Sequence, residues 1–517
     1  MRSRSTLRAA IVPAVALRAA LLLLCICASA AFAPGLSAKD PTFQWLYGAG
    51  GYDIFYGLTT TADGGYLAVG TSSSYNGSDR DVYVVRTDAC GALVWSATYD
   101  IGHGGYDVGY KVVRGLDGGY VIVGTTQNTL TCCQTGYDPF VMKIDDAGNV
   151  IWAKTYPALD DDDGFDIATY SNTGYVIAGR YNSIGNGQGD GFLMRIDLAG
   201  TPTMARTYGG AGFDELTSVA VAANGDIIAA GRTFSYTTDN FEKLYLVRTN
   251  PDLTPQWSYF YGADSTIEAA NDVLAMKDGS IAVFGRASSK APFYYEQPYL
   301  LRLTSTGACQ CDQVFAVADT NRGELTEARE LPNGELAATG FYFNEAAGLG
   351  RFDMLLMRID GKCNRVWAEQ YGVDWRDQGF ALVPLYTAGV TLPTNYIVAG
   401  STNSFNGGGF DDAYLVRADR NGISGCNEYE TVMSARSPGF CARKAPTVAN
   451  AFLVGCATYT GPDYNTDSEL LCRICDIPDL NVDPGDGLLS HRSGATGTER
   501  IAHPNGVEMM RTQVSQR

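Results

Sequence analysis

The sequence is poor in charge, in basic residues and in histidine. Only 18% of its 517 residues are charged and three are histidines, against about 25% charged residues in ordinary globular chains. Lys and Arg total 38 against 56 Asp and Glu, a formal charge of -18. No basic stretch is dense enough to neutralise a row of phosphates. This composition argues against a nucleic acid partner, a His-rich metal site or a long helical coiled coil.

Long apolar runs are also scarce. The one prominent run, residues 19–28, follows the basic residues Arg2, Arg4, Arg8 and Arg18 and precedes several small residues. This pattern predicts a signal peptide over residues 1–38. A membrane span needs about 20 apolar residues, and Arg18 interrupts this one, so we expect no stable membrane span.

Cysteines support an exported protein. Of the 13 cysteines, Cys25 and Cys27 would leave with the signal peptide, and 13 − 2 = 11 would remain. In an oxidising compartment such a number predicts several disulfides and one unpaired thiol. We therefore expect a secreted or cell-surface protein.

Glycine, by contrast, is abundant, and it marks an internal repeat. Extended runs such as YLAVGTS and YVIVGTT recur along the chain, and each contains a glycine at the same place. These glycines are Gly70, Gly124, Gly179, Gly231, Gly285, Gly340, Gly400 and Gly455. Their spacing defines eight units of about 55 residues, the sequence signature of a repeat architecture.

Each unit holds four extended segments joined by short turns such as Asp63-Gly64-Gly65, which is typical of a four-stranded antiparallel blade. The third segment carries a basic residue, for example Arg86, which predicts an ion-pair lattice between strands. The sequence thus predicts an all-β fold: an eight-bladed β-propeller of four-stranded antiparallel blades over residues 39–477. A polar tail over residues 478–517 is predicted to be flexible.

The segment around Trp45 precedes the first complete unit. We expect this N-terminal strand to complete the last blade by pairing with the strand at residues 470–475. Closing the ring in this way would remove free sheet edges.

Acidic residues begin the inner strands and would crowd the mouth of the central channel. Asp107, Asp162 and Asp214 belong to this set. Two interpretations stay open: these carboxylates cap backbone N–H groups, or they form an acidic rim that takes a cation or a cationic ligand.

The longer loops all emerge on one face of a propeller. They carry aromatic residues that suit stacking on sugar rings or contact with a protein partner. The candidate ligand-binding residues there are Tyr137, Tyr294, Tyr295, Trp375 and Arg376.

One loop carries a run of four carboxylates, Asp160, Asp161, Asp162 and Asp163. Clustered carboxylates favour hard cations, so calcium is the metal that this run would bind, and no other cofactor is expected. The run lacks the alternating spacing of a calcium loop, and a solvated turn is the alternative.

These features favour a secreted, non-enzymatic binding or scaffold module for extracellular glycan or protein. The alternative is a carbohydrate-active enzyme, a glycoside hydrolase or a polysaccharide lyase, that uses carboxylates at the channel mouth. Because acids recur in every unit, no catalytic residue is assigned. The oligomeric state is not indicated.

The phrases YGAGGYD, DGGYLAVGTSSS and DVYVVRTDACGALVW resemble the repeats of bacterial secreted β-propeller proteins over residues 45–475. Some members of that group are labelled endoglucanase-like, so the resemblance implies a propeller and raises that activity as an expectation. The D-x-x-G-x-x-x-W turn partly resembles the tryptophan-docking repeats of eight-bladed quinoprotein dehydrogenases. Some of these carry a disulfide between adjacent cysteines, like the pair Cys132-Cys133, but their calcium site has no counterpart in this sequence.

Overall fold

The computed structural model describes residues 42–440 and, beyond them, five short strands. Within 42–440 it leaves out the segments 76–78, 103, 129–135, 157–160, 183–187, 238, 289–294, 318–320, 344–351, 374, 388, 406–408, 426 and 432. Every regular element that is described is a β-strand. In this part of the chain no helix has the length and apolar character to cross a bilayer.

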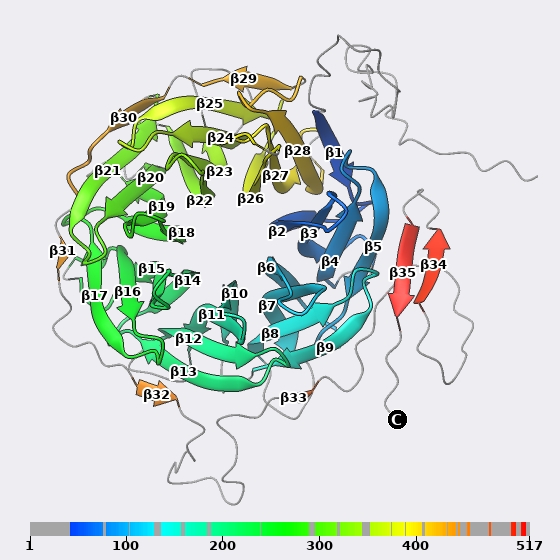
Figure 1. The fold of residues 1–517 in the computed structure, drawn as a ribbon, viewed down its shortest axis with the longest axis horizontal. Coiled ribbons are helices and arrows are strands. Elements are labelled where there is room, and N and C mark those ends of the chain that lie inside the picture. Colours follow the sequence, from blue (N-terminus) through cyan, green and yellow to red (C-terminus); the bar gives the residue numbers. More distant parts are fainter. Residues whose placement is uncertain are drawn as a thin grey trace, which may run out of the picture.

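Seven four-stranded antiparallel sheets stand around a central axis as the blades of a propeller (Figure 1). The first four blades are β2 (Asp53–Thr60), β3 (Tyr66–Ser72), β4 (Asp81–Thr87), β5 (Leu93–Tyr99); β6 (Asp107–Arg114), β7 (Tyr120–Asn128), β8 (Gly136–Ile144), β9 (Val150–Thr155); β10 (Asp163–Tyr170), β11 (Gly174–Tyr181), β12 (Asp190–Asp197), β13 (Pro202–Tyr208); and β14 (Asp214–Val221), β15 (Ile227–Thr233), β16 (Lys243–Thr249), β17 (Pro255–Tyr261). The last three are β18 (Glu268–Ala275), β19 (Ile281–Ser288), β20 (Glu296–Leu303), β21 (Cys309–Ala316); β22 (Arg322–Glu330), β23 (Leu336–Phe343), β24 (Asp353–Ile359), β25 (Arg365–Tyr371); and β26 (Asp377–Leu385), β27 (Asn395–Thr402), β28 (Asp412–Asp419), β1 (Phe43–Tyr47).

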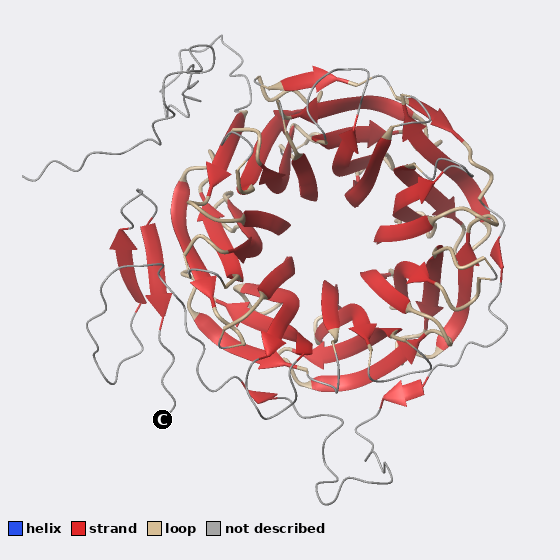
Figure 2. Cartoon of the chain, turned by 180° about the vertical axis from the view of Figure 1, so that it is seen from behind, coloured by secondary structure: helices blue, strands red, loops and turns tan. Residues whose placement is uncertain are grey.

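The innermost strand of every blade begins on the same side of the ring, which we call the upper face. Seen from behind, these strands converge on the ring axis (Figure 2). The core lies between neighbouring blades: Leu67 and Val84 of blade 1 pack with Ile122 and Phe140 of blade 2. Because the middle strands are covered on both sides, their apolar runs are continuous rather than alternating.

The prediction of eight blades is wrong, since the ring closes with seven. The N-terminal strand β1 does complete the last blade, but that blade is the seventh, and its partner is β28 rather than residues 470–475. Trp45 lies opposite Leu415 in this antiparallel pairing. In the eighth repeat, the described strands pair with the outer edges of other blades and do not form a blade of their own.

After β28, the described strands of the chain lie around the outside of the ring instead. Its short strands add to the outer edges of successive blades in reverse order, and we call them the strap: β29 (Glu428–Glu430) on blade 6, β30 (Ser434–Arg436) on blade 5, β31 (Arg443–Lys444) on blade 4, β32 (Phe452–Val454) on blade 3, β33 (Cys475–Asp476) on blade 2 and β35 (Glu508–Thr512) on blade 1. Figure 1 shows the first of these strands in orange on the outer rim. β34 (Thr498–Ala502) pairs with β35. Such pairing covers sheet edges that would otherwise be exposed.

The strap is anchored by side chains on blades 5 and 6. The Thr431 hydroxyl donates to Gln370 Oε1 at 2.6 Å, and the Phe440 backbone N–H donates to Asp312 Oδ2 at 2.7 Å. The Met433 and Phe440 side chains are buried in the interblade cores. This part of the repeat is therefore used as an outer covering of the ring.

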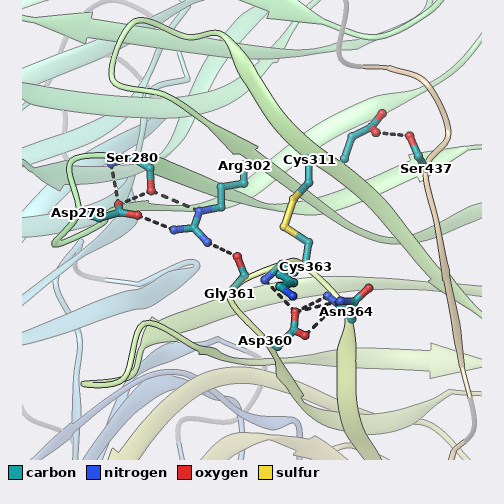
Figure 3. The surroundings of a disulfide bond; sticks show 11 residues. Asp278, Ser280, Arg302, Cys311, Asp360, Gly361, Cys363, Asn364 and Ser437 are labelled. Carbon is teal, nitrogen blue, oxygen red and sulfur yellow. Dashed lines mark hydrogen bonds and ion pairs between the residues drawn. A yellow bond between two sulfur atoms is a disulfide. The ribbon is translucent and has the colours of Figure 1, made fainter.

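A disulfide between Cys311 and Cys363 links blades 5 and 6 (Figure 3). Cys311 lies on β21 and Cys363 in the turn between β24 and β25. Beside it, Arg302 donates to Asp278 Oδ2 at 2.6 Å and to the Gly361 carbonyl at 2.8 Å, a second link between the two blades. Cys90 and Cys309 are also disulfide-bonded. The predicted signal peptide, Cys132-Cys133 and the boundaries 1–38 and 478–517 are not tested by these residues and stay predictions.

Ring closure yields a stability prediction. Phe43 of β1 is 2% exposed and packs in a core with Tyr66 and Leu415, whereas Trp45 of the same strand is 42% exposed. Phe43→Ala should lower the free energy of unfolding by about 3–5 kcal/mol, and Trp45→Ala should cost far less. Chemical denaturation measures both. Equal losses from the two substitutions would contradict the pairing described here.

Candidate functional site: a cavity in the central channel

A β-bulge interrupts every inner strand at the same position. Each lies where the pairing register shifts, as between Phe55 and Gly57 of β2. The bulged residues, in blade order, are Tyr56, Tyr110, Phe165, Thr217, Asn271, Thr326 and Phe380. A bulge re-aims a side chain out of the pleat. All seven side chains line one cavity of about 190 Å³ in the channel.

Aromatic rings occupy one side of this cavity. Tyr56 lies 5.0 Å from Phe380 and 5.5 Å from Tyr110, and Tyr110 lies 5.7 Å from Phe165, measured between ring centroids. These four residues come from the adjacent blades 7, 1, 2 and 3, and we call them the aromatic arc. All four are half-buried, so ring surface remains open to the channel.

Polar side chains occupy the other side. Thr217, Asn271 and Thr326, from blades 4, 5 and 6, present hydroxyl and amide groups. The Thr217 hydroxyl donates to the Ala270 carbonyl at 2.8 Å, and the Asn271 amide donates to the Leu325 carbonyl at 2.9 Å, in each case in the next blade. The cavity is thus apolar on one side and hydrogen-bonding on the other.

Charged residues follow the bulged residue on four of the inner strands, and three of them, Lys111, Asp166 and Asp272, also line the cavity. Lys111 of blade 2 forms an ion pair with Glu327 of blade 6, and this pair bridges the channel. Arg329 also pairs with Glu327, and Lys111 Nζ lies 3.9 Å from Asp166 Oδ1. The five charged groups of this cluster are Lys111, Arg329, Asp166, Asp272 and Glu327.

The three acids of the cluster also join neighbouring blades. Asp166 Oδ2 accepts the Val219 N–H at 2.9 Å, and Asp272 Oδ2 accepts the Ala328 N–H at 2.7 Å. Glu327 accepts the N–H of Leu382 in the same way. Each bond runs from one blade to the inner strand of the next, so the cluster has a structural role as well as a place in the cavity.

Ser218 lies between two of these acids. Its Oγ is 2.8 Å from Asp166 Oδ2 and 3.0 Å from Asp272 Oδ1. Because a hydroxyl has one proton, it can donate to only one carboxylate at a time. Burial raises the pKa of Asp272 to about 6. Asp272 can therefore hold a proton at mildly acidic pH.

The acids predicted at the channel mouth are buried at the upper ends of the blades and do not line the cavity. Asp107 is 1% exposed, and Asp162 and Asp214 are fully buried. They accept backbone N–H groups, from Ile101 at 2.7 Å for Asp107 and from Gly210 at 2.8 Å for Asp214. This geometry is that of carboxylates that cap loops, and their role in ligand binding stays a prediction.

The predicted loop residues are spread over three blades. Tyr137 belongs to blade 2, and Trp375 and Arg376 precede blade 7. Tyr295 precedes β20 of blade 5, and the Cζ of Arg322 lies 4.9 Å from the centroid of its ring. Trp375 is 38% exposed, and Arg376 pairs with Asp411. Tyr294 lies outside the described residues. None of the described four lines the cavity.

The predicted calcium ligands have separate hydrogen-bond partners. Asp161 Oδ1 accepts the Tyr137 N–H at 3.1 Å, Asp162 Oδ1 accepts the Asn182 N–H at 2.9 Å, and Asp163 pairs with Arg180. Asp160 lies outside the described residues. A calcium site at this run stays a prediction that these contacts do not support.

Sequence reasoning missed the bulged residues that line the cavity. In most units an acid begins the inner strand, and the bulged residue lies three positions after it. The missed signal was that the residue type at this position changes from unit to unit. That position is aromatic in four consecutive units of the closed ring and polar in the other three. A repeat position whose residue type differs between groups of blades can mark a binding site, whereas a position that is the same in every blade cannot.

No protein-family model matches the chain, and no curated protein matches it. The chain is similar at low sequence identity to several solved structures. They include an α-L-arabinofuranosidase of Fusarium graminearum in complex with arabinobiose (10% identity, TM-score 0.38, covering 73% of this chain and 98% of that one) and Sqt1 of Chaetomium thermophilum (10% identity, TM-score 0.35, covering 72% and 100%). The arrangement of its own strands defines the protein as a β-propeller. Similarities at this level do not indicate its function.

Buried carboxyls at the blade ends predict an unusual pH dependence. Burial raises the pKa of Asp53 to about 6, of Asp377 to about 7 and of Glu268 to about 8. Above pH 4 to 5 the unfolded chain has lost these protons while the folded chain keeps them, so stability falls as pH rises toward 8. The melting temperature should therefore be higher at pH 5 than at pH 8.5.

Asp377→Asn removes one of these titrating groups. Between pH 5 and 7 the free energy of unfolding of this variant should therefore fall less steeply with pH, by up to ~1.4 kcal/mol per pH unit. Asp63→Asn is the matched control, because the hydrogen bond from Thr61 lowers the pKa of Asp63 and its effect is confined to acid pH. Thermal unfolding of both variants across this range is the test. A stability that rises with pH would show that these carboxyls are ionised in the folded protein.

Proposed function

We propose that this β-propeller is an exported binding protein whose channel cavity holds a saccharide unit of an extracellular glycan. The single observation that carries the proposal is the division of one cavity into an aromatic arc and a polar side. Sugar rings have an apolar face that stacks on aromatic rings and hydroxyls that need hydrogen-bond partners. The cavity provides both on opposite walls.

The proposed extracellular location rests on the Cys311–Cys363 disulfide and on the signal-peptide pattern of residues 1–38. The acidic net charge of -18 favours the solubility of such a protein. A protein partner at the upper-face loops is the competing proposal, since aromatic residues serve both kinds of ligand.

Removal of one ring from the aromatic arc tests the proposal. A glycan array identifies ligands, and isothermal titration calorimetry measures affinity. Tyr56→Ala should weaken binding at least tenfold, about 1.4 kcal/mol, because it removes the central ring of the arc. Tyr386→Ala is the control: this tyrosine is 43% exposed and follows β26 on the lower face. Unchanged affinity in Tyr56→Ala would place the ligand elsewhere.

A second candidate, glycoside hydrolysis, is favoured by the pair Asp166 and Asp272. Two carboxyl groups that share one serine hydroxyl beside a saccharide cavity meet the minimum requirement for acid and base roles. The raised pKa of Asp272 suits it to donate a proton to a leaving oxygen. Asp166, 3.9 Å from Lys111 Nζ, would supply the second carboxyl group.

Release of reducing sugars from the glycans that bind decides between binding and hydrolysis. A hydrolase should lose at least 100-fold of its activity in Asp272→Asn, the range expected for loss of a general acid, and keep it in Asp63→Asn. Binding without sugar release in the unaltered protein would rule out hydrolysis of these glycans.

A further inference from the structure

Arg80 lies on the upper face between two tyrosines. Its Cζ is 4.9 Å from the ring centroid of Tyr52 and 5.4 Å from that of Tyr106. Its backbone is fixed at the junction of blades 1 and 2, because its N–H donates to the Gly105 carbonyl at 3.0 Å and its own carbonyl accepts the Asp107 N–H at 2.7 Å. The guanidinium is therefore held in a defined place by its backbone and by two rings.

No acid neutralises this arginine within the described part of the chain. The arginines that follow the marker glycines on β11, β15 and β19 are each ion-paired: Arg180 with Asp163, Arg232 with Glu215 and Arg286 with Glu242. Arg376, also on the upper face, is paired with Asp411. Among the described residues, the Arg80 side chain makes only its two ring contacts, in a chain where acids outnumber bases 56 to 38. Its planar set of N–H donors remains available for an anion.

The two rings beside Arg80 belong to the same chain segments as two of the cavity residues. Tyr52 and Tyr106 precede the cavity residues Tyr56 and Tyr110 by four positions on the same two inner segments, ~13 Å along extended chain. Burial raises the pKa of Tyr56, and the charge of Arg80 opposes that rise, so the two groups interact electrostatically. Phe410, 49% exposed, stacks edge-on at 4.8 Å from Tyr52 and extends the aromatic surface toward blade 7.

We propose that Arg80 is a subsite for a carboxylate of the glycan, and that the ligand is an acidic oligosaccharide containing uronic acid units. One ring occupies the cavity against the aromatic arc, and the chain extends upward so that a carboxylate meets the guanidinium. Carboxylate and guanidinium match as a two-pronged pair of charge-assisted hydrogen bonds. This inference rests on the proposed glycan binding at the cavity and adds the chemical class of the ligand.

The test compares a uronic acid oligosaccharide with its carboxyl-reduced, neutral counterpart by isothermal titration calorimetry. The unaltered protein should bind the acidic form about tenfold more tightly, and added salt should reduce that preference. Arg80→Gln should lower the affinity for the acidic form to that for the neutral one and leave neutral binding unchanged. Arg80→Lys keeps the charge but loses the planar fork, so it should retain part of the preference.

Arg114→Gln is the matched control, because Arg114 is an exposed arginine at the lower end of β6. The preference of this variant for the acidic over the neutral oligosaccharide should equal that of the unaltered protein. Equal affinity of the unaltered protein for the two forms, or an equal loss for both in Arg80→Gln, would overturn the role of Arg80 while leaving glycan binding intact. Binding of neither form would overturn the proposed function as well.

Discussion

The architecture depends on the pairing of β1 with β28. The chain reaches blade 7 with three strands, and the fourth comes from residues 43–47 at the other end of the propeller sequence. Until these strands meet, blade 7 lacks its outermost strand and the ring of blades is not closed. The cavity exists only in the closed ring, because its walls come from all seven blades. The sequence separation of the two strands makes this contact costly in chain entropy, and β1 recovers that cost by burying Phe43 and Tyr47.

Closure also explains why one cavity has two chemically different sides. A ring of near-identical blades would present the same residue seven times around the axis. The bulges give each blade one side chain that lines the channel cavity. Tyr56 and Asn271 therefore occupy equivalent places with different chemistry. The Lys111–Glu327 pair bridges the channel, so charged groups lie close to any bound ligand.

Sequence reasoning predicted local features well and the closure of the ring poorly. The predicted turn at Asp63-Gly64-Gly65 joins β2 to β3. Ion pairs of the third-strand basic residues are present in several blades, but their partners are acids of the hairpin turns, Asp63 for Arg86 and Asp278 for Arg302. Arg195 instead donates to the Pro251 carbonyl. The number of blades was wrong because the repeat was counted over residues that still resemble it. The segment around Glu428–Glu430 keeps strand character but pairs with the outer edge of β25. Strand propensity does not specify the partner of a strand, and here tertiary context decided it. The cavity was missed for a related reason: acids that recur in most units, such as Asp107, attract attention, yet they accept hydrogen bonds from loop backbone.

The central claim is that the channel cavity, and specifically its aromatic arc, is where the ligand binds. A crystal structure of the protein with a bound oligosaccharide tests it most directly. The account predicts a sugar ring stacked on Tyr56 and Tyr110 with its hydroxyls toward Thr217 and Asn271. A sugar bound only to the outer loops, with the cavity filled by water, would contradict it.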